Sequence, residues 1–89
     1  MRAIVTVVGK DQVGIIANVC SRLAAYNINI LDISQTVIDG FFNMIMITDI
    51  SAATKPLAEI AAAMADEGKT HGMSVRIQRE DIFDAMHRI

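Results

Sequence analysis

A glycine-bracketed segment, Gly9-Lys-Asp-Gln-Val-Gly14, lies between an apolar β-branched run and a predicted helix. A helix that begins here leaves free backbone N–H groups and the positive end of its dipole at the loop. Such a terminus can receive an anion, including an amino-acid carboxylate. Gly14 has no Cβ and would let a ligand or a neighbouring backbone approach. A structural alternative remains, in which Asp11 caps the helix and Gly14 allows close packing of helix on strand.

Two asparagines, Asn27 and Asn29, flank the entry to the second predicted strand. An asparagine side chain carries an acceptor and a donor, which suits a zwitterion whose carboxylate and ammonium lie close together. Asn27 is better explained as the residue that ends the preceding helix, because asparagine tolerates the geometry of a helix C-cap. Asn29 stands in a strand, where asparagine is disfavoured unless its side chain has a partner. We therefore keep Asn29 as a candidate binding residue.

Signals for catalysis or metal binding are weak. The spacing of the two glycines imitates a phosphate-binding loop, but Ile15 and Ile16 stand where Lys and Ser or Thr should follow. Neither a Gly-x-Ser-x-Gly nor a His-Glu-x-x-His motif occurs. His71 and His87 are expected to be solvated, and Cys20 falls on an apolar helical stripe. A single cysteine excludes an intramolecular disulfide and a cysteine-rich zinc site.

The hydrophobic periodicity predicts four strands and two helices in the order β-α-β-β-α-β. The expected strands cover 2–8, 28–38, 41–50 and 73–78. The first helix has its apolar stripe at Ile16, Val19, Cys20 and Leu23, and the second opens at Lys55-Pro56 and ends at Gly68 or Gly72. Asp39-Gly40 predicts a type I′ hairpin turn. Residues 80–89 carry apolar residues at helical spacing, which predicts a short C-terminal helix.

This order predicts a ferredoxin-like α+β sandwich, with a four-stranded antiparallel sheet and both helices on one face. The first and third strands are apolar on both faces, which places them in the middle of the sheet. Two helices leave the other face open, so the apolar surface around Ile4 and Ile45, and the edge of the second strand, need a second copy, the tail or both. A chain of 89 residues buries only about 60% of its unfolded surface, which also favours self-association.

Composition narrows the classes of function. The chain is 53% hydrophobic with a formal charge of −2 and only 4% aromatic residues. The absence of a basic run and of Trp argues against a nucleic-acid surface. No apolar stretch approaches the roughly 20 residues that span a bilayer, and the N-terminus lacks the apolar region of a secretory signal. We expect a cytoplasmic protein.

The segments G-K-D-Q-V-G-I-I-A, A-A-Y-N-I-N-I-L-D-I and D-G-F-F resemble the ACT domain, a small amino-acid-sensing regulatory module of β-α-β-β-α-β topology. The resemblance covers 1–79, leaves 80–89 as a tail, and is nearest to free-standing single-domain ACT proteins; it extends to the modules of the glycine-cleavage transcriptional repressor. It implies that chains pair, often side by side through the second strand and first helix, and bind amino acids where the loop of one chain meets its neighbour. Carried over by position, the ligand-binding residues are Asp11, Gln12, Val13, Gly14 and Ile15, with Asn29 and Ile30 opposite them.

We therefore expect a homodimer that binds a small ligand, an amino acid by resemblance, and regulates a partner protein in trans without catalysis, cofactor or metal. One alternative is a constitutive protein-protein adaptor that has this fold and no ligand. Another is a small enzyme of the same topology, such as an acylphosphatase. That chemistry would require an arginine in the phosphate loop, and the turn contains Lys10 but no arginine.

Overall fold

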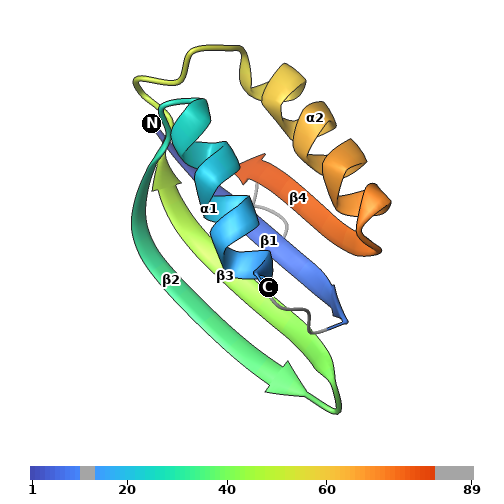
Figure 1. The fold of residues 1–89 in the computed structure, drawn as a ribbon. Helices are drawn as coiled ribbons and strands as arrows, with labels where there is room; N and C mark the ends of the chain where they lie inside the picture. Colours follow the sequence, from blue (N-terminus) through green and yellow to red (C-terminus); the bar gives the residue numbers. More distant parts are fainter. Residues whose placement is uncertain (11–13, 82–89) are drawn as a thin grey trace.

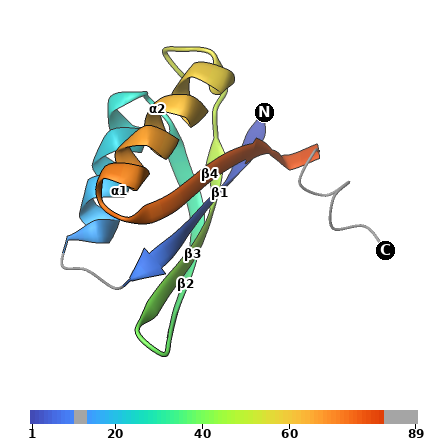
Figure 2. The same ribbon diagram turned by 90° about the vertical axis from the view of Figure 1, so that its right-hand side faces the viewer.

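A computed structural model describes residues 1–10 and 14–81 of the chain. The described elements are β1 (Arg2–Lys10), α1 (Ile15–Ala25), β2 (Asn29–Ile38), β3 (Phe41–Asp49), α2 (Leu57–Thr70) and β4 (Met73–Arg79). The strands form one antiparallel sheet in the order β2-β3-β1-β4, and both helices lie on the same face (Figures 1 and 2). The predicted ferredoxin-like sandwich is confirmed, with the first and third strands in the centre. Most of the helix predicted for 80–89 lies outside the described residues, which end at residue 81.

One hydrophobic core fills the space between the helices and the sheet. In β1, the fully buried Ala3, Val5 and Val7 alternate with residues of the other face, as the two-residue period of a strand requires. The apolar stripe of α1 agrees in part with the expected one. Val19 and Leu23 are buried as predicted and Ile15 is buried with them, whereas Ile16 and Cys20 are half-buried at the margin of the core. Within the described ranges, neither helix is long and apolar enough to cross a bilayer.

The first strand continues past the point where the sequence predicted a turn. Gly9 and Lys10 still pair with Phe42 and Phe41 of β3. A Cβ at Gly9 would meet the sulfur of the flexible Met73 side chain on β4, which would have to move, and would lie 3.1 Å from the carbonyl oxygen of Gly72. Gly9 therefore permits a close side-chain contact across the sheet.

The two glycines near the end of α2 have different roles. The prediction that Gly68 could end the helix is wrong, because α2 continues through it to Thr70. A Cβ at Gly68 would lie 2.8 Å from Val75 Cγ2 and 2.9 Å from the carbonyl oxygen of Met73, so this glycine lets α2 approach β4. Gly72 follows the helix with φ of 72° and supplies the left-handed residue that ends it.

The predicted turn and helix-ending residues adopt the expected conformations. Asp39 and Gly40 have φ of 52° and 80°, both positive, as a type I′ turn requires. Asn27 has φ of 61° just after α1. Its backbone N–H donates to the carbonyl of Ala24, and the N–H of the next residue donates to Leu23, which together make a Schellman motif.

The face of the sheet away from the helices is partly apolar and uncovered. Ile38, Phe41 and Ile45 are 62%, 49% and 46% exposed, so the expectation of uncovered apolar surface is correct near Ile45. It is wrong for Ile4, which is buried between its register partners on β3 and β4. The uncovered surface is thus concentrated on the β2–β3 hairpin, which extends beyond the helices in Figure 2.

Candidate functional site

The loop between β1 and α1 is described only in part. Three of the predicted ligand-binding residues, Asp11, Gln12 and Val13, lie outside the described residues. The N-cap of α1 is Gly14, with φ of 79° and no side-chain capping hydrogen bond. Its carbonyl accepts the first helical hydrogen bond, from the N–H of Asn18, over 2.9 Å. Gly14 is therefore the exposed start of the helix, and Ile15 is its first buried residue.

The structural alternative predicted that Gly14 allows close packing of the helix on the strand, and the structure contradicts this. A Cβ built at Gly14 would meet no other atom within 4 Å. The requirement for glycine instead comes from its positive φ, which residues with a Cβ adopt only with strain. The space above Gly14 is open, so a ligand or a second chain could approach the start of α1.

The other predicted half of the site lies at the far end of α1. Asn29 and Ile30 are the first residues of β2; the former is exposed and the latter is half-buried against the core. The 11 residues of α1 span about 16 Å, and they separate Gly14 from Asn29. A single chain therefore does not bring the two predicted halves together.

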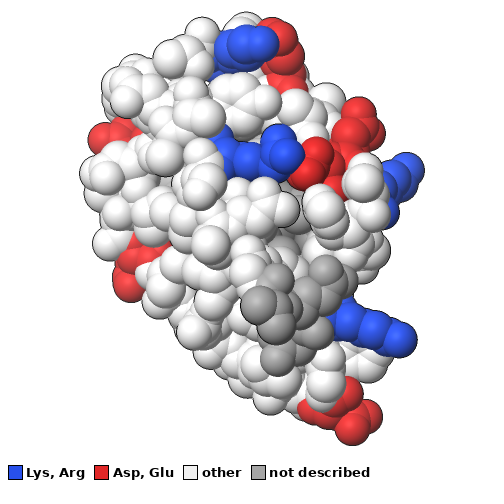
Figure 3. All heavy atoms as spheres, viewed as in Figure 1, with Lys and Arg blue, Asp and Glu red and all other residues white. Residues whose placement is uncertain are grey.

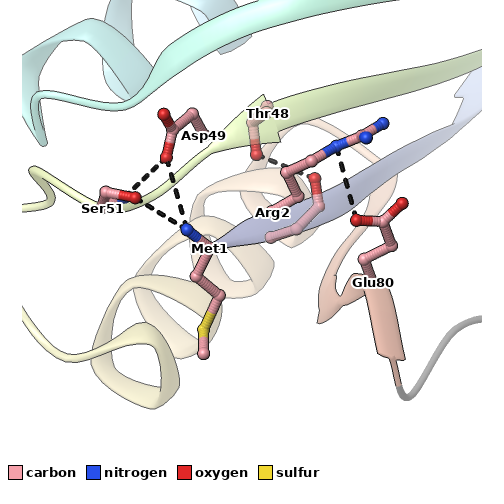
Figure 4. A network of polar contacts seen from close by, with 7 residues as sticks. Met1, Arg2, Thr48, Asp49, Ser51 and Glu80 are labelled. Carbon is pink, nitrogen blue, oxygen red and sulfur yellow. Dashed lines mark hydrogen bonds and ion pairs between the residues drawn. The ribbon is translucent and has the colours of Figure 1, made fainter.

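Asn29 lies beside a small polar network at the chain terminus. Its register partner on β3 is Asp49, whose Oδ1 accepts a hydrogen bond from the backbone N–H of Ser51 over 2.9 Å. The N-terminal ammonium donates to the hydroxyl of Ser51 over 2.7 Å and lies 3.8 Å from Asp49 (Figure 4). Hydrogen bonds from the Ser51 side chain and backbone lower the pKa of Asp49 below its usual value. Asp49 therefore stays ionised next to the start of β2.

A cavity of about 140 Å³ lies between α1 and α2, above β4. Its lower part is apolar and its rim is polar, and it begins at Gly14. Among the predicted binding residues that the structure describes, Gly14 and Ile15 line it, while Asn29 and Ile30 do not. The remaining lining residues are Asn18, Val19, Arg22, Met64, Glu67, Gly68, His71, Met73 and Val75.

The polar rim of this cavity is a connected cluster that joins the two helices. Nη2 of Arg22 lies 2.6 Å from Oε1 of Glu67, and Nε2 of His71 lies 3.1 Å from the same oxygen. Nε of Arg22 also donates to Oδ1 of Asn18 over 3.2 Å. The Glu67 side chain is 29% exposed, so the cluster is partly withdrawn from water. One cation and one anion thus face the same small space.

Sequence reasoning missed this cluster and left His71 as a solvated histidine. The side chain of His71 is about half exposed, and it contacts Glu67. A signal was present, because Asn18 and Arg22, like Glu67 and His71, are spaced i, i+4 on their helices. Nothing in that spacing says that the two pairs face each other, since the pairs come from helices far apart in the sequence.

Among the described residues, the helix-bearing surface carries charges of both signs. Figure 3 shows basic and acidic groups lying next to one another on this face, separated by uncharged surface. Nζ of Lys55, just before α2, lies 3.4 Å from Oε1 of Glu59 in its first turn, which makes another such pair. Interspersed charges of this kind do not create the extended positive field that attracts polyanions.

Comparison with known proteins identifies the fold family. A family model described as the ACT domain matches residues 2–78. The chain belongs to the ACT domain family. It is 52% identical to a UPF0237 protein of Listeria monocytogenes over 89 residues, all of both chains. Its structure is similar to that of an ACT domain protein from Streptococcus pneumoniae, with a TM-score of 0.82 and 38% identity over 94% of each chain.

The ACT domain fold also recurs in more distant proteins. A putative glycine cleavage system transcriptional repressor matches 88% of this chain with a TM-score of 0.74 and 20% identity, over 44% of the repressor's own length. That likeness concerns the fold alone. ACT domains are commonly regulatory modules that bind small ligands, and this class of function agrees with the fold and the small cavity described above.

Proposed function

We propose that this ACT domain, residues 1–79, is a cytoplasmic homodimeric module that binds an amino acid and regulates a partner protein in trans. The observation that carries the proposal is the separation of Gly14 from Asn29 by the length of α1. Both residues are exposed, so each is accessible to a ligand or to a second chain. A site built from both halves is completed only when two chains meet.

The edge strand β2 supplies a surface on which a second copy can pair. It is hydrogen-bonded to β3 on one side only, and Leu31, Ile33 and Val37 are 51%, 39% and 53% exposed. An uncovered apolar edge with free backbone groups is a template for strand pairing. A two-fold axis at this edge sets the strands antiparallel, so the start of β2 in one copy faces the end of the other copy where α1 begins. Asn29 and Gly14 would then belong to one composite site.

Regulation follows from thermodynamic linkage. A ligand that contacts both chains binds the assembled state and stabilises it by RT ln(1 + [L]/Kd), which is about 2.7 kcal/mol at a hundredfold excess over Kd. The same differential affinity would shift any equilibrium in which a partner protein recognises the dimer. No chemical step is required of the chain.

Titration calorimetry against the twenty amino acids, together with static light scattering, tests this proposal. We expect a dimer at micromolar concentration and binding of at least one amino acid that raises the dimer fraction. Gly14→Val should abolish binding, whereas Gly40→Val should not, although both glycines have φ near 80° and no atom within 4 Å of a built Cβ. Silence across the panel at millimolar concentration would refute the amino-acid ligand, and a stable monomer would refute the composite site.

A further inference from the structure

We propose that the cavity between α1 and α2 is a ligand site contained within one chain, which takes a zwitterionic amino acid with an apolar side chain. The proposal rests on the proposed function for its ligand class and adds a second place for such a ligand, within each chain, to the one between two chains. It is argued from the volume, lining and charge of the cavity.

The volume and lining of the cavity fit a compact apolar group. A cavity of about 150 Å³ with an aliphatic and aromatic lining holds a molecule of the size of benzene, and this one measures about 140 Å³. Val19, Met64, Met73 and Val75 supply apolar side chains from both helices and from β4. Methionine side chains adapt their shape at low cost, so the pocket can accept branched, thioether or aromatic groups of this size.

The charges of the rim specify the other end of the ligand. Arg22 and Glu67 carry opposite charges and lie 2.6 Å apart at the same cavity. An amino acid has the complementary pair, with a carboxylate for the guanidinium and an ammonium for the carboxylate. A carboxylate can accept about four hydrogen bonds, and the two described contacts use one oxygen of Glu67, so capacity for an ammonium remains.

Charge balance distinguishes a zwitterion from other small apolar molecules. A monocarboxylate would compete with Glu67 for Arg22 and leave an excess negative charge in a partly desolvated site. An amine would compete with Arg22 for Glu67 and leave an excess positive charge. A zwitterion satisfies both groups and keeps the site neutral, so the geometry favours it over each of its two singly charged analogues.

Methionine-methyl NMR provides a test with an internal control. Met64 and Met73 line the cavity, whereas Met44 and Met46 are fully buried and do not. Titration with leucine, methionine or phenylalanine should shift the first two signals and leave the second two in place. Isocaproate, which lacks the ammonium of leucine, and isoamylamine, which lacks the carboxylate, should bind at least about tenfold more weakly.

Glu67→Gln tests the charge argument without changing the size of the side chain. Leucine should bind the variant about 10- to 100-fold more weakly, while isocaproate should bind it more tightly than the unmodified protein because Arg22 has lost its competing carboxylate. Glu59→Gln, on the same helix and also in an ion pair, should leave both affinities unchanged.

Several outcomes would overturn the cavity site. The cavity site is refuted if none of the three amino acids shifts the Met64 and Met73 signals. It is also refuted if Glu67→Gln binds leucine as tightly as the unmodified protein does. Calorimetric binding that is lost in Gly14→Val and Asn29→Ala, without methyl shifts, would refute the cavity and support the two-chain site. Methyl shifts that persist in Asn29→Ala, with no change in dimer fraction, would support the cavity and refute the two-chain site.

Discussion

Gly68→Ala provides a sharp test of the packing beneath the cavity because two physical effects predict opposite signs. Gly68 lies inside α2, where alanine is favoured over glycine by roughly 1 kcal/mol of helix propensity. Propensity alone therefore predicts a stabilised protein. The structure predicts the reverse, because the added methyl group would lie 2.8 Å from Val75 Cγ2 and 2.9 Å from the carbonyl oxygen of Met73.

The size of the effect follows from what can move. A valine methyl can shift slightly, but the Met73 carbonyl belongs to the backbone of β4, which pairs with β1. Forcing a methyl group into a packed contact costs about 1–3 kcal/mol. After the gain in propensity, we expect a net loss of about 1 kcal/mol in the free energy of unfolding. For a domain of this size, the melting temperature would fall by roughly 4–8 °C.

Urea unfolding followed by circular dichroism, at a fixed chain concentration, measures this change. Ala63→Gly, at an exposed position of the same helix, calibrates propensity alone and should cost roughly 1 kcal/mol. Both substitutions should therefore destabilise the protein, although one replaces glycine by alanine and the other replaces alanine by glycine. A Gly68→Ala variant that is more stable by the amount that Ala63→Gly loses would refute the close approach of α2 to β4.

Two further predictions concern single residues at the ends of elements. Hydrogen bonds from Ser51 lower the pKa of Asp49, so its stabilising contribution is present above the ordinary value of about 3.9 and is lost as the pH falls through the lowered one. As the pH falls from about 7 to about 3, the urea midpoint of Asp49→Asn should therefore approach that of the unmodified protein. A difference between the two midpoints that does not change with pH would contradict this. Asn27 has φ of 61°, and its Nδ2 donates to the carbonyl of Ala52. In thermal unfolding, Asn27→Ala should be more destabilising than Asn27→Gly by roughly 1 kcal/mol, because a residue with a Cβ is strained at positive φ. Equal losses would show that backbone conformation does not decide the choice of residue there.

Local sequence signals predicted much of this fold because they act over a few residues. The Asp39-Gly40 pair specified its turn through positive φ, and Asn27 specified the end of α1 in the same way. The central place of β1 and β3 followed from strands that are apolar on both faces. Gly68 shows the limit of such signals, since its role depends on contacts with a strand that comes later in the chain.

The candidate site was less predictable for the same physical reason. The start of α1 is a local feature, and its glycine was identified from sequence. The ion pair of Arg22 and Glu67 joins residues 45 positions apart, and no local periodicity reports which faces of two helices meet. Charged residues at helical spacing are usually solvated, so sequence alone gave no reason to single out this pair.

The distribution of uncovered apolar surface connects the fold to the proposed association. The half of the sheet beneath the helices is well covered, and Val5, Val7 and Met44 are fully buried there. The hairpin half is less covered, because β2 lies at the edge of the sheet: Val37, on its helix side, is 53% exposed, and Phe41, on the opposite face of β3, is 49% exposed. A second copy added at the β2 edge would cover the helix-side residues of this strand and place Asn29 beside the neighbouring chain. The surface that the fold leaves unpacked thus includes the edge where the two halves of the proposed site can meet, which would make occupancy of that site and association interdependent.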